Sequence, residues 1–142
     1  MKELTINART EELDAVLQFV DVQLEAMDCP PKVQMQIDLA VEEIFVNIAN
    51  YAYRPGTGTA TIRVDAEGSS VSITFIDSGI PYDPLKKDDP DISLPAEQRQ
   101  IGGLGILLVK KTMDDVRYDY VNACNVLTIV KVIETGKQKG LT

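Results

Sequence analysis

The chain begins with apolar residues that first alternate with polar ones and then recur at helical spacing. Leu4 and Ile6 alternate with polar neighbours over residues 2–7, which predicts a short strand. Thr10 is suited to be the N-cap of a helix with acidic residues in its first turn, and we expect this helix to end in the stretch 28–31, which contains two prolines. Its apolar positions are Leu13, Val16, Leu17, Val20 and Leu24.

A second helix is predicted from Pro31, because proline is favoured at a first helical position. Its apolar stripe extends to about Tyr53, which makes it the longest element of the chain. Turn-forming residues at 54–58 end it. The stripe consists of Val33, Ile37, Val41, Ile44 and Ile48.

Two further alternating runs predict a hairpin, and a long irregular segment follows it. Residues 60–65 and 71–77 alternate in the manner of half-buried strands, with a turn at 67–69 between them. Residues 78–101 contain several prolines and scattered charges without a sustained period. A segment of this length is too long for a plain connection in a compact domain, and such a loop is usually functional. We therefore expect a lid over residues 78–101.

The last third of the chain predicts one more helix and two closing strands. The helix opens at Gly102, and the strands cover 116–121 and 126–132. This order of elements favours an α+β fold, a two-layer sandwich of helices on a sheet, over a doubly wound parallel sheet. We expect one domain over residues 1–134 and a polar tail over 135–142.

Composition narrows the possible functions. The chain has 142 residues, with 14 basic and 22 acidic side chains, two cysteines and no histidine. The net charge of −8 attracts neither nucleic-acid phosphates nor anionic lipids, so we expect no direct nucleic-acid partner and no membrane partner. The lack of histidine excludes Ser-His-Asp and Cys-His nucleophile pairs and histidine metal sites. Without a signal-peptide pattern or a membrane-spanning apolar run, we expect a cytoplasmic protein.

The long helix carries the first candidate site. Glu43 and Asn47 are four residues apart, so they lie on adjacent turns of one face, beside the apolar stripe. A carboxylate there can accept a proton from an attacking hydroxyl, and an Asn amide oxygen is a hard neutral ligand suited to Mg²⁺ bound with phosphates. The alternative is that Glu42, Glu43 and Asn50 are solvated residues on the flank of an amphipathic helix.

The second candidate is the run Asp77-Ser78-Gly79, at the end of the second hairpin strand. An Asp that ends an apolar strand presents an acceptor at the rim of a sheet, and a glycine beside it lets a flat ligand approach the backbone. Such an acceptor suits an amine donor such as that of adenine. The alternative is an ordinary tight turn, because Asp-Ser-Gly ahead of Pro81 is common turn chemistry.

The third candidate is the run Gly102-Gly103-Leu104-Gly105, which stands directly ahead of an apolar helical stretch. Glycines at the start of a helix let several backbone N–H groups point at one anion, and the helix dipole adds positive potential there. The run therefore predicts a phosphate-binding site. The alternative is a glycine-rich hinge for the lid. Two better-known phosphate motifs, the P-loop and the dinucleotide fingerprint, are absent.

Together these stretches resemble the motifs of the GHKL ATPase superfamily, which includes DNA gyrase, histidine kinases and mismatch-repair ATPases. The stretch 43–47 resembles its N box, 77–79 its first glycine box and 103–105 its second. Within the superfamily, the chain is similar over nearly its whole length to the small stand-alone anti-sigma-factor serine/threonine kinases. The residues that carry this similarity are Glu42-Glu43-x-x-x-Asn47, Tyr51-Ala52-Tyr53, Asp77-x-Gly79-x-Pro81-Tyr82-Asp83-Pro84, Gly102-Gly103-Leu104-Gly105 and Asn125-Val126-Leu127-Thr128.

The resemblance implies the Bergerat ATP-binding fold, with a mixed sheet and its helices on one face, and ATP with Mg²⁺ as ligands. Carried over by position, it makes Glu43 the general base and Asn47 the Mg²⁺ ligand. Asp77 becomes the adenine acceptor, Gly79 the adjacent backbone contact, and Thr128 a residue near the adenine. The expected phosphate contacts come from the second glycine box: Gly102, Gly103, Leu104 and Gly105.

The chain departs from the family pattern at two positions. The family often has histidine where Tyr51 stands here. It also has an arginine close before the second glycine box, where Ile101 stands here. The nearest arginine is Arg99, and we expect it to reach the γ-phosphate because the predicted lid is long.

Our leading hypothesis from the resemblance is a serine/threonine-protein kinase. Members of that family use ATP to phosphorylate a small anti-sigma antagonist of the STAS fold, and they hold a sigma factor in a competing complex, usually as homodimers. The alternative is a non-catalytic switch in which ATP binding gates a protein partner. A third hypothesis, the catalytic part of a histidine kinase, needs another polypeptide to carry the phosphoacceptor, because this chain has no histidine.

Overall fold

The computed structural model describes residues 1–86 and 103–133. The strands are β1 (Lys2–Asn7), β2 (Thr59–Glu67), β3 (Ser70–Asp77), β4 (Asp115–Val121) and β5 (Cys124–Val132), and the α-helices are α1 (Leu13–Ala26), α2 (Pro31–Asn47) and α3 (Gly103–Thr112). Short helical turns lie at Thr10–Glu12, at Ile48–Ala52, a π-helical turn labelled η2, and at Pro84–Lys86. None of the helices in these two ranges is long and apolar enough to cross a membrane.

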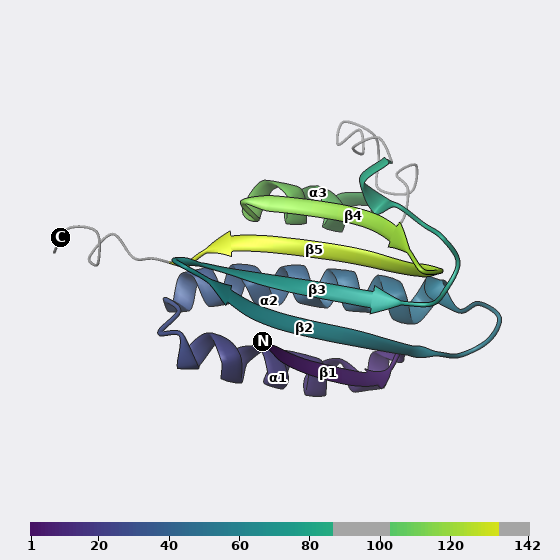
Figure 1. Ribbon diagram of the computed structural model, residues 1–142, viewed down its shortest axis with the longest axis horizontal. Helices are drawn as coiled ribbons and strands as arrows, with labels where there is room; N and C mark the ends of the chain where they lie inside the picture. The colour runs from purple at the N-terminus through teal and green to yellow at the C-terminus, as the bar shows by residue number, and fades with distance from the viewer. Residues whose placement is uncertain (87–102, 134–142) are drawn as a thin grey trace, which may run out of the picture.

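The described strands form one sheet in the order β1-β2-β3-β5-β4, and α1, α2 and α3 cover one of its faces (Figure 1). This arrangement confirms the expected α+β sandwich. The expectation of a mixed sheet is wrong for the described strands, because all their neighbouring pairs are antiparallel. The cause is the β4–β5 hairpin: β4 runs parallel to β3, but β5 turns back and lies between them.

The first helix begins later than its sequence pattern predicted. Thr10 belongs to a 3₁₀ turn, and α1 begins at Leu13. The Thr10 hydroxyl donates to Glu11 Oε1 at 3.0 Å and makes no cap bond to the backbone. Thr10 is therefore not the N-cap that we expected, because a neighbouring carboxylate takes its hydroxyl.

Helix α2 lies between α1 and α3 behind the middle of the sheet (Figure 1). It begins at Pro31 as predicted, and its apolar stripe packs against the inward-facing residues of the sheet in a single core. The stripe continues past the α-helix into η2, where Ile48 is half-buried against the same core. The largest fully buried side chains from α2 and the sheet are Phe45, Phe75, Ile37, Ile44, Ile62, Ile73 and Ile129.

An acidic pair lies in the contact between α1 and α2. Asp21 and Asp38 each have one carboxyl oxygen, Oδ1, that is buried without a hydrogen-bond partner among the described residues. Burial raises the pKa of Asp38 to about 7, and the hydrogen bond and charge of Asp21 and the charge of Glu25 add to the rise. The pair therefore favours a protonated Asp38, since two carboxylates at one place repel each other.

The structure places only part of the segment that was expected to be a lid. Of residues 78–101, it describes those up to Lys86, including the turn Pro84–Lys86. Arg99 and Gly102 lie outside the described residues, as does the expected tail 135–142. Helix α3 begins at Gly103, so the described part of the second glycine box forms its first turn.

Candidate functional site

A cavity of about 410 Å³ lies between α2 and the helix-facing side of the sheet. Its volume is in the range typical of small-molecule sites, and most of its lining is apolar. The walls come from α2 with η2, from the end of β3, the middle of β4 and the start of β5, from residues 80–84 and from α3. The lining residues include Ile44, Asn47, Ile48, Tyr51, Ala52, Phe75, Asp77, Ile80, Ile106, Tyr118, Asn125 and Leu127.

Asp77 provides a buried acceptor in the wall of the cavity. It is the last residue of β3, and only 6% of its surface is exposed. Its Oδ1 accepts hydrogen bonds from the Gly79 backbone N–H and from Asn125 Nδ2, both at 2.9 Å. Its Oδ2 receives no hydrogen bond from a described residue, so this oxygen remains available to a donor on a ligand.

Gly79 lets the loop after β3 touch the π-helical turn. A Cβ atom at this position would lie 2.2 Å from the backbone oxygen of Ala52, which cannot move aside as a side chain can. The next residue, Ile80, donates its backbone N–H to that same oxygen at 2.8 Å. The absence of a side chain at Gly79 therefore closes the cavity beside Asp77.

Tyr53 holds the same loop from the other side. Its hydroxyl donates to the backbone oxygen of Thr59 at 2.6 Å and accepts the backbone N–H of Ser78 at 2.8 Å. Its ring lies so close to Gly58 that a Cβ there would come within 2.3 Å of a ring carbon. Tyr53 thus ties the start of β2 to the residue after Asp77.

Glu43 and Asn47 lie together on α2. Asn47 Nδ2 donates to Glu43 Oε2 at 2.9 Å, and Asn47 also lines the cavity. Burial raises the pKa of Glu43 above its ordinary value, the hydrogen bond from Asn47 partly offsets this rise, and the charge of Glu42 adds to it. The predicted pair therefore exists, with its amide and carboxylate oriented by one another.

The carboxylate of Glu43 rests on the first turn of α3. A Cβ atom at Gly105 would lie 2.0 Å from Glu43 Oε1. Only glycine leaves room for this contact, which brings the carboxylate to a helix N-terminus, where backbone N–H groups and the helix dipole favour negative charge. The structure thus joins the first and third candidate sites.

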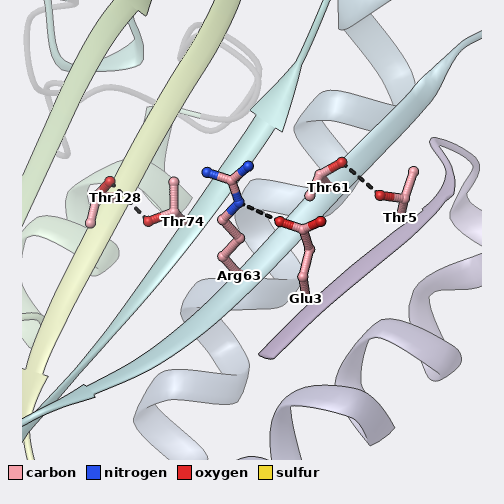
Figure 2. A network of polar contacts seen from close by, with 6 residues as sticks. All are labelled: Glu3, Thr5, Thr61, Arg63, Thr74 and Thr128. Carbon is pink, nitrogen blue, oxygen red and sulfur yellow. Dashed lines mark hydrogen bonds and ion pairs between the residues drawn. The ribbon is translucent and has the colours of Figure 1, made fainter. Parts of the chain in front are cut away.

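Thr128 lies on the other face of the sheet. Its hydroxyl contacts the Thr74 hydroxyl at 3.3 Å (Figure 2), within a polar network that includes the Arg63–Glu3 ion pair. The helices lie behind the sheet in this view, so Thr128 points away from the cavity. Our expectation of Thr128 near the adenine does not fit this position, because successive side chains of a strand point to opposite faces.

Sequence analysis did not assign a role to two polar residues of the cavity, Asn125 and Tyr118. Asn125 stands opposite Asp77 in the β3–β5 pair, and Tyr118 of β4 reaches it from the next strand. Asn125 belongs to the stretch that resembles the family motif, but only Thr128 was selected from it. Alternation along β5 places Asn125 on the same face as Leu127, and the structure shows that this is the buried face.

The remaining described residues of the motifs lie at the start of α3 and in the wall of the cavity. Gly103 and Leu104 begin α3, and Gly105 follows them in the same turn. Tyr51 lines the cavity, and the guanidinium of Arg54 lies 5.4 Å from the centre of its ring. The cavity thus has mostly apolar walls that include the Asp77 acceptor and the Asn47 amide. The Asn47 amide in turn contacts the carboxylate of Glu43 beside the first turn of α3.

Comparison with known proteins assigns the fold to a family. Residues 6–131 match the model of the histidine kinase-like ATPase domain. This chain belongs to the histidine kinase-like ATPase domain family. Membership implies an ATP-binding domain, and the matched residues include every described part of the cavity.

This ATPase domain is distantly similar in sequence to two serine-protein kinases. Serine-protein kinase RsbW of Bacillus cereus is 29% identical over 93 residues, which are 63% of this chain and 58% of RsbW. Serine/threonine-protein kinase BtrW of Bordetella bronchiseptica is 26% identical over 99 residues, which are 69% of this chain and 70% of BtrW. The match thus spans less than two thirds of the length of RsbW.

Solved structures agree on the architecture. The histidine kinase domain of the blue-light activated histidine kinase EL346 of Erythrobacter litoralis has a TM-score of 0.56 at 17% identity, over 91% of this chain and 64% of that one. Acinetobacter baumannii histidine kinase AdeS has a TM-score of 0.54 at 11% identity, over 95% of this chain and 70% of AdeS. At these identities the likeness concerns the fold alone.

Proposed function

We propose that this ATPase domain is a protein kinase that transfers the γ-phosphate of ATP to a serine or threonine hydroxyl of a partner protein. The observation that supports this most directly is the carboxylate of Glu43, half-buried, oriented by Asn47 and resting on the first turn of α3. A base in that position serves phosphoryl transfer to a hydroxyl, whereas ATP binding alone does not need it.

The base of ATP would occupy the apolar part of the cavity. A carboxylate oxygen accepts hydrogen bonds only, so the free Oδ2 of Asp77 selects a ring that carries an amine at the matching position, as adenine does. Gly79 packs against the backbone of Ala52 and donates its own backbone N–H to Asp77 Oδ1, so it holds the carboxylate in place for the ring. The triphosphate would then extend toward the start of α3.

The residues beside the expected phosphates fit a magnesium ion. Mg²⁺ usually takes one or two protein oxygens and fills its other positions with water and phosphate oxygens. Asn47 donates through its Nδ2 to Glu43, which leaves its Oδ1 free to act as such a ligand. Within the described ranges no cluster of three or more acidic or thiol groups could hold a metal alone, so phosphates would complete the site. The ion would neutralise charge on the phosphates.

Glu43 would receive the proton in the transfer step. The hydroxyl oxygen of the partner forms a bond to the γ-phosphorus while the bond from that phosphorus to the β,γ-bridging oxygen breaks, and ADP leaves. The hydroxyl proton passes to the Glu43 carboxylate. Burial raises the pKa of Glu43, which makes its ionised form a stronger base than an exposed carboxylate.

The similarity to RsbW and BtrW, whose names describe serine and serine/threonine kinases, supports a proposal about the partner proteins. We propose a STAS-domain anti-sigma antagonist as the substrate and a sigma factor as the competing partner, in the manner of the anti-sigma kinases that the motifs resemble. A homodimer would be the working form. Partner switching would then depend on the phosphorylation state of the antagonist.

The test compares Glu43→Ala with Glu42→Ala, a matched control on the exposed side of the same helix turn. Calorimetry measures ATP binding, and transfer of labelled γ-phosphate is measured to purified STAS-domain proteins from the same organism. We expect Glu43→Ala to bind ATP within a few-fold of wild type and to lose transfer, while Glu42→Ala retains both. Normal transfer by Glu43→Ala would refute the base assignment. ATP binding without any transfer by wild type would instead support the non-catalytic switch.

A further inference from the structure

Asn125 forms the centre of a buried hydrogen-bond network beside the cavity. Its side chain, 7% exposed, donates from Nδ2 to Asp77 Oδ1 and to the backbone oxygen of Ile80, both at 2.9 Å. Its Oδ1 accepts the backbone N–H of Tyr82 at 3.0 Å and the hydroxyl of Tyr118. One side chain therefore joins β5 to the end of β3, to β4 and to the segment 80–82.

These contacts use the whole hydrogen-bonding capacity of the side chain. An asparagine has two N–H donors and two acceptor lone pairs, and Asn125 satisfies all four within the protein. Rotating the amide by half a turn would set its oxygen against the oxygens of Asp77 and Ile80. The network thus fixes the orientation of the amide and leaves Asn125 without a donor or acceptor for a ligand.

The contact with Asp77 decides which of its oxygens remains free. Oδ1 receives two donors, one from Asn125 and one from the Gly79 backbone, which fills its two lone pairs. Oδ2 is left as the acceptor for a ligand in the cavity. We propose that Asn125 is the positioning residue for base recognition, and that it acts on the nucleotide only by holding Asp77. This inference rests on the proposed binding of ATP.

Tyr118 supports Asn125 from the edge strand. Its hydroxyl is the second donor to Asn125 Oδ1 and keeps the amide from turning. Burial raises the pKa of Tyr118, and the charges of Asp83 and Asp77 add to the rise although the Tyr82 backbone opposes it, so the phenol retains its proton and can donate. Its removal should loosen Asn125 without removing the bond to Asp77.

The experiment measures dissociation constants for ATP and for purine riboside triphosphate, which lacks the 6-amino group. The ratio of the two constants reports base recognition separately from phosphate binding. A hydrogen bond to a charged acceptor gives an expected preference for ATP of about 10- to 100-fold in wild type. We expect Asn125→Ala to lose most of this preference while its affinity for purine riboside triphosphate stays the same. Thr128→Val, on the opposite face of β5, should keep the wild-type ratio.

A double-mutant cycle tests whether Asn125 acts through Asp77. The variant Asp77→Ala should have a ratio near that of Asn125→Ala, and combining the two substitutions should reduce the ratio no further. A wild-type ratio in Asn125→Ala, or equal weakening of both nucleotides, would overturn the inference and leave the proposed function intact. Failure of the wild type to bind ATP would refute both.

Tyr118→Phe keeps the test decisive if Asn125→Ala does not fold. A thermal melt shows whether each variant unfolds cooperatively. Tyr118→Phe is expected to lower the ratio by at least about threefold, since one donor that fixes the amide is gone. If Asn125→Ala does not melt cooperatively, an unchanged ratio in Tyr118→Phe overturns the inference.

Discussion

Replacing Gly105 with alanine should greatly reduce phosphate transfer while it changes the free energy of unfolding only slightly. The new Cβ would lie 2.0 Å from Oε1 and 2.1 Å from Cδ of Glu43, which is closer than any real contact. The obstacle is the end of a flexible side chain, so the Glu43 carboxylate would rotate away while the backbone of α3 stays in place. The hydrogen bond from Asn47 to Glu43 would break with that movement.

The effect on stability should be small because two contributions oppose each other. Alanine is a better helix former than glycine by about 0.8–1 kcal/mol. A lost hydrogen bond of this kind costs about 0.5–1.5 kcal/mol. We therefore expect the free energy of unfolding to stay within about 1 kcal/mol of wild type. Transfer should fall by about 10²- to 10⁴-fold, the usual contribution of a positioned general base.

Three measurements check this prediction: urea denaturation for stability, calorimetry for ATP binding, and single-turnover transfer of labelled phosphate. Gly79→Ala is the contrasting variant, because its Cβ would meet a backbone oxygen at 2.2 Å, and we expect a loss of about 1–3 kcal/mol there. Wild-type transfer by Gly105→Ala would show that the position of the Glu43 carboxylate does not matter. A loss of stability as large as that of Gly79→Ala would show that the backbone of α3 cannot stay in place.

Three further substitutions have clear expected outcomes. Asp38→Asn should be more stable than wild type at pH 8 by about 1–2 kcal/mol after allowance for solvent screening, and the difference should vanish as the pH falls from 7 to 4. The reason is that wild-type Asp38 has a pKa of about 7 in the folded protein, so its ionisation beside Asp21 destabilises the fold as the pH rises. Urea denaturation at a series of pH values checks this prediction. Asn47→Ala should weaken ATP binding when Mg²⁺ is present but not in EDTA, as calorimetry would show. Tyr53→Phe removes the acceptor for Ser78 and should weaken ATP binding by about 5- to 10-fold, measured the same way.

Local patterns were sufficient to predict most elements of the fold. Pro31 correctly predicted the start of α2, and the apolar stripe after it predicted the buried face of that helix. Alternation of apolar and polar residues predicted the β2–β3 hairpin. The pairing of β3 with β5 could not be read from the sequence, because it depends on a hairpin that returns through the middle of the sheet. The expectation of a mixed sheet came from the family resemblance, and it is wrong for the described strands.

The candidate site was predictable where its residues are neighbours on one element. Glu43 and Asn47 are four residues apart on a helix, and their contact follows from helical geometry. Asp77 and Gly79 follow in the same way from a strand end.

Contacts between elements could not be predicted. In β5 both faces carry apolar residues, Val126 and Val130 on one and Leu127 and Ile129 on the other, so the pattern did not show which face would be buried. Thr128 was selected from the resemblance to the family motif, and the pattern of β5 offered no reason to choose Asn125 instead. The contact between Glu43 and Gly105 also could not be predicted from the sequence, because it joins two different helices, α2 and α3.

The most direct test of the account is a crystal structure with magnesium and a non-hydrolysable ATP analogue. We predict that the base lies in the cavity with its 6-amino group on Asp77 Oδ2, and that the triphosphate reaches Asn47 and the first turn of α3. A nucleotide bound elsewhere, or a base in the cavity that makes no contact with Asp77, would contradict the account.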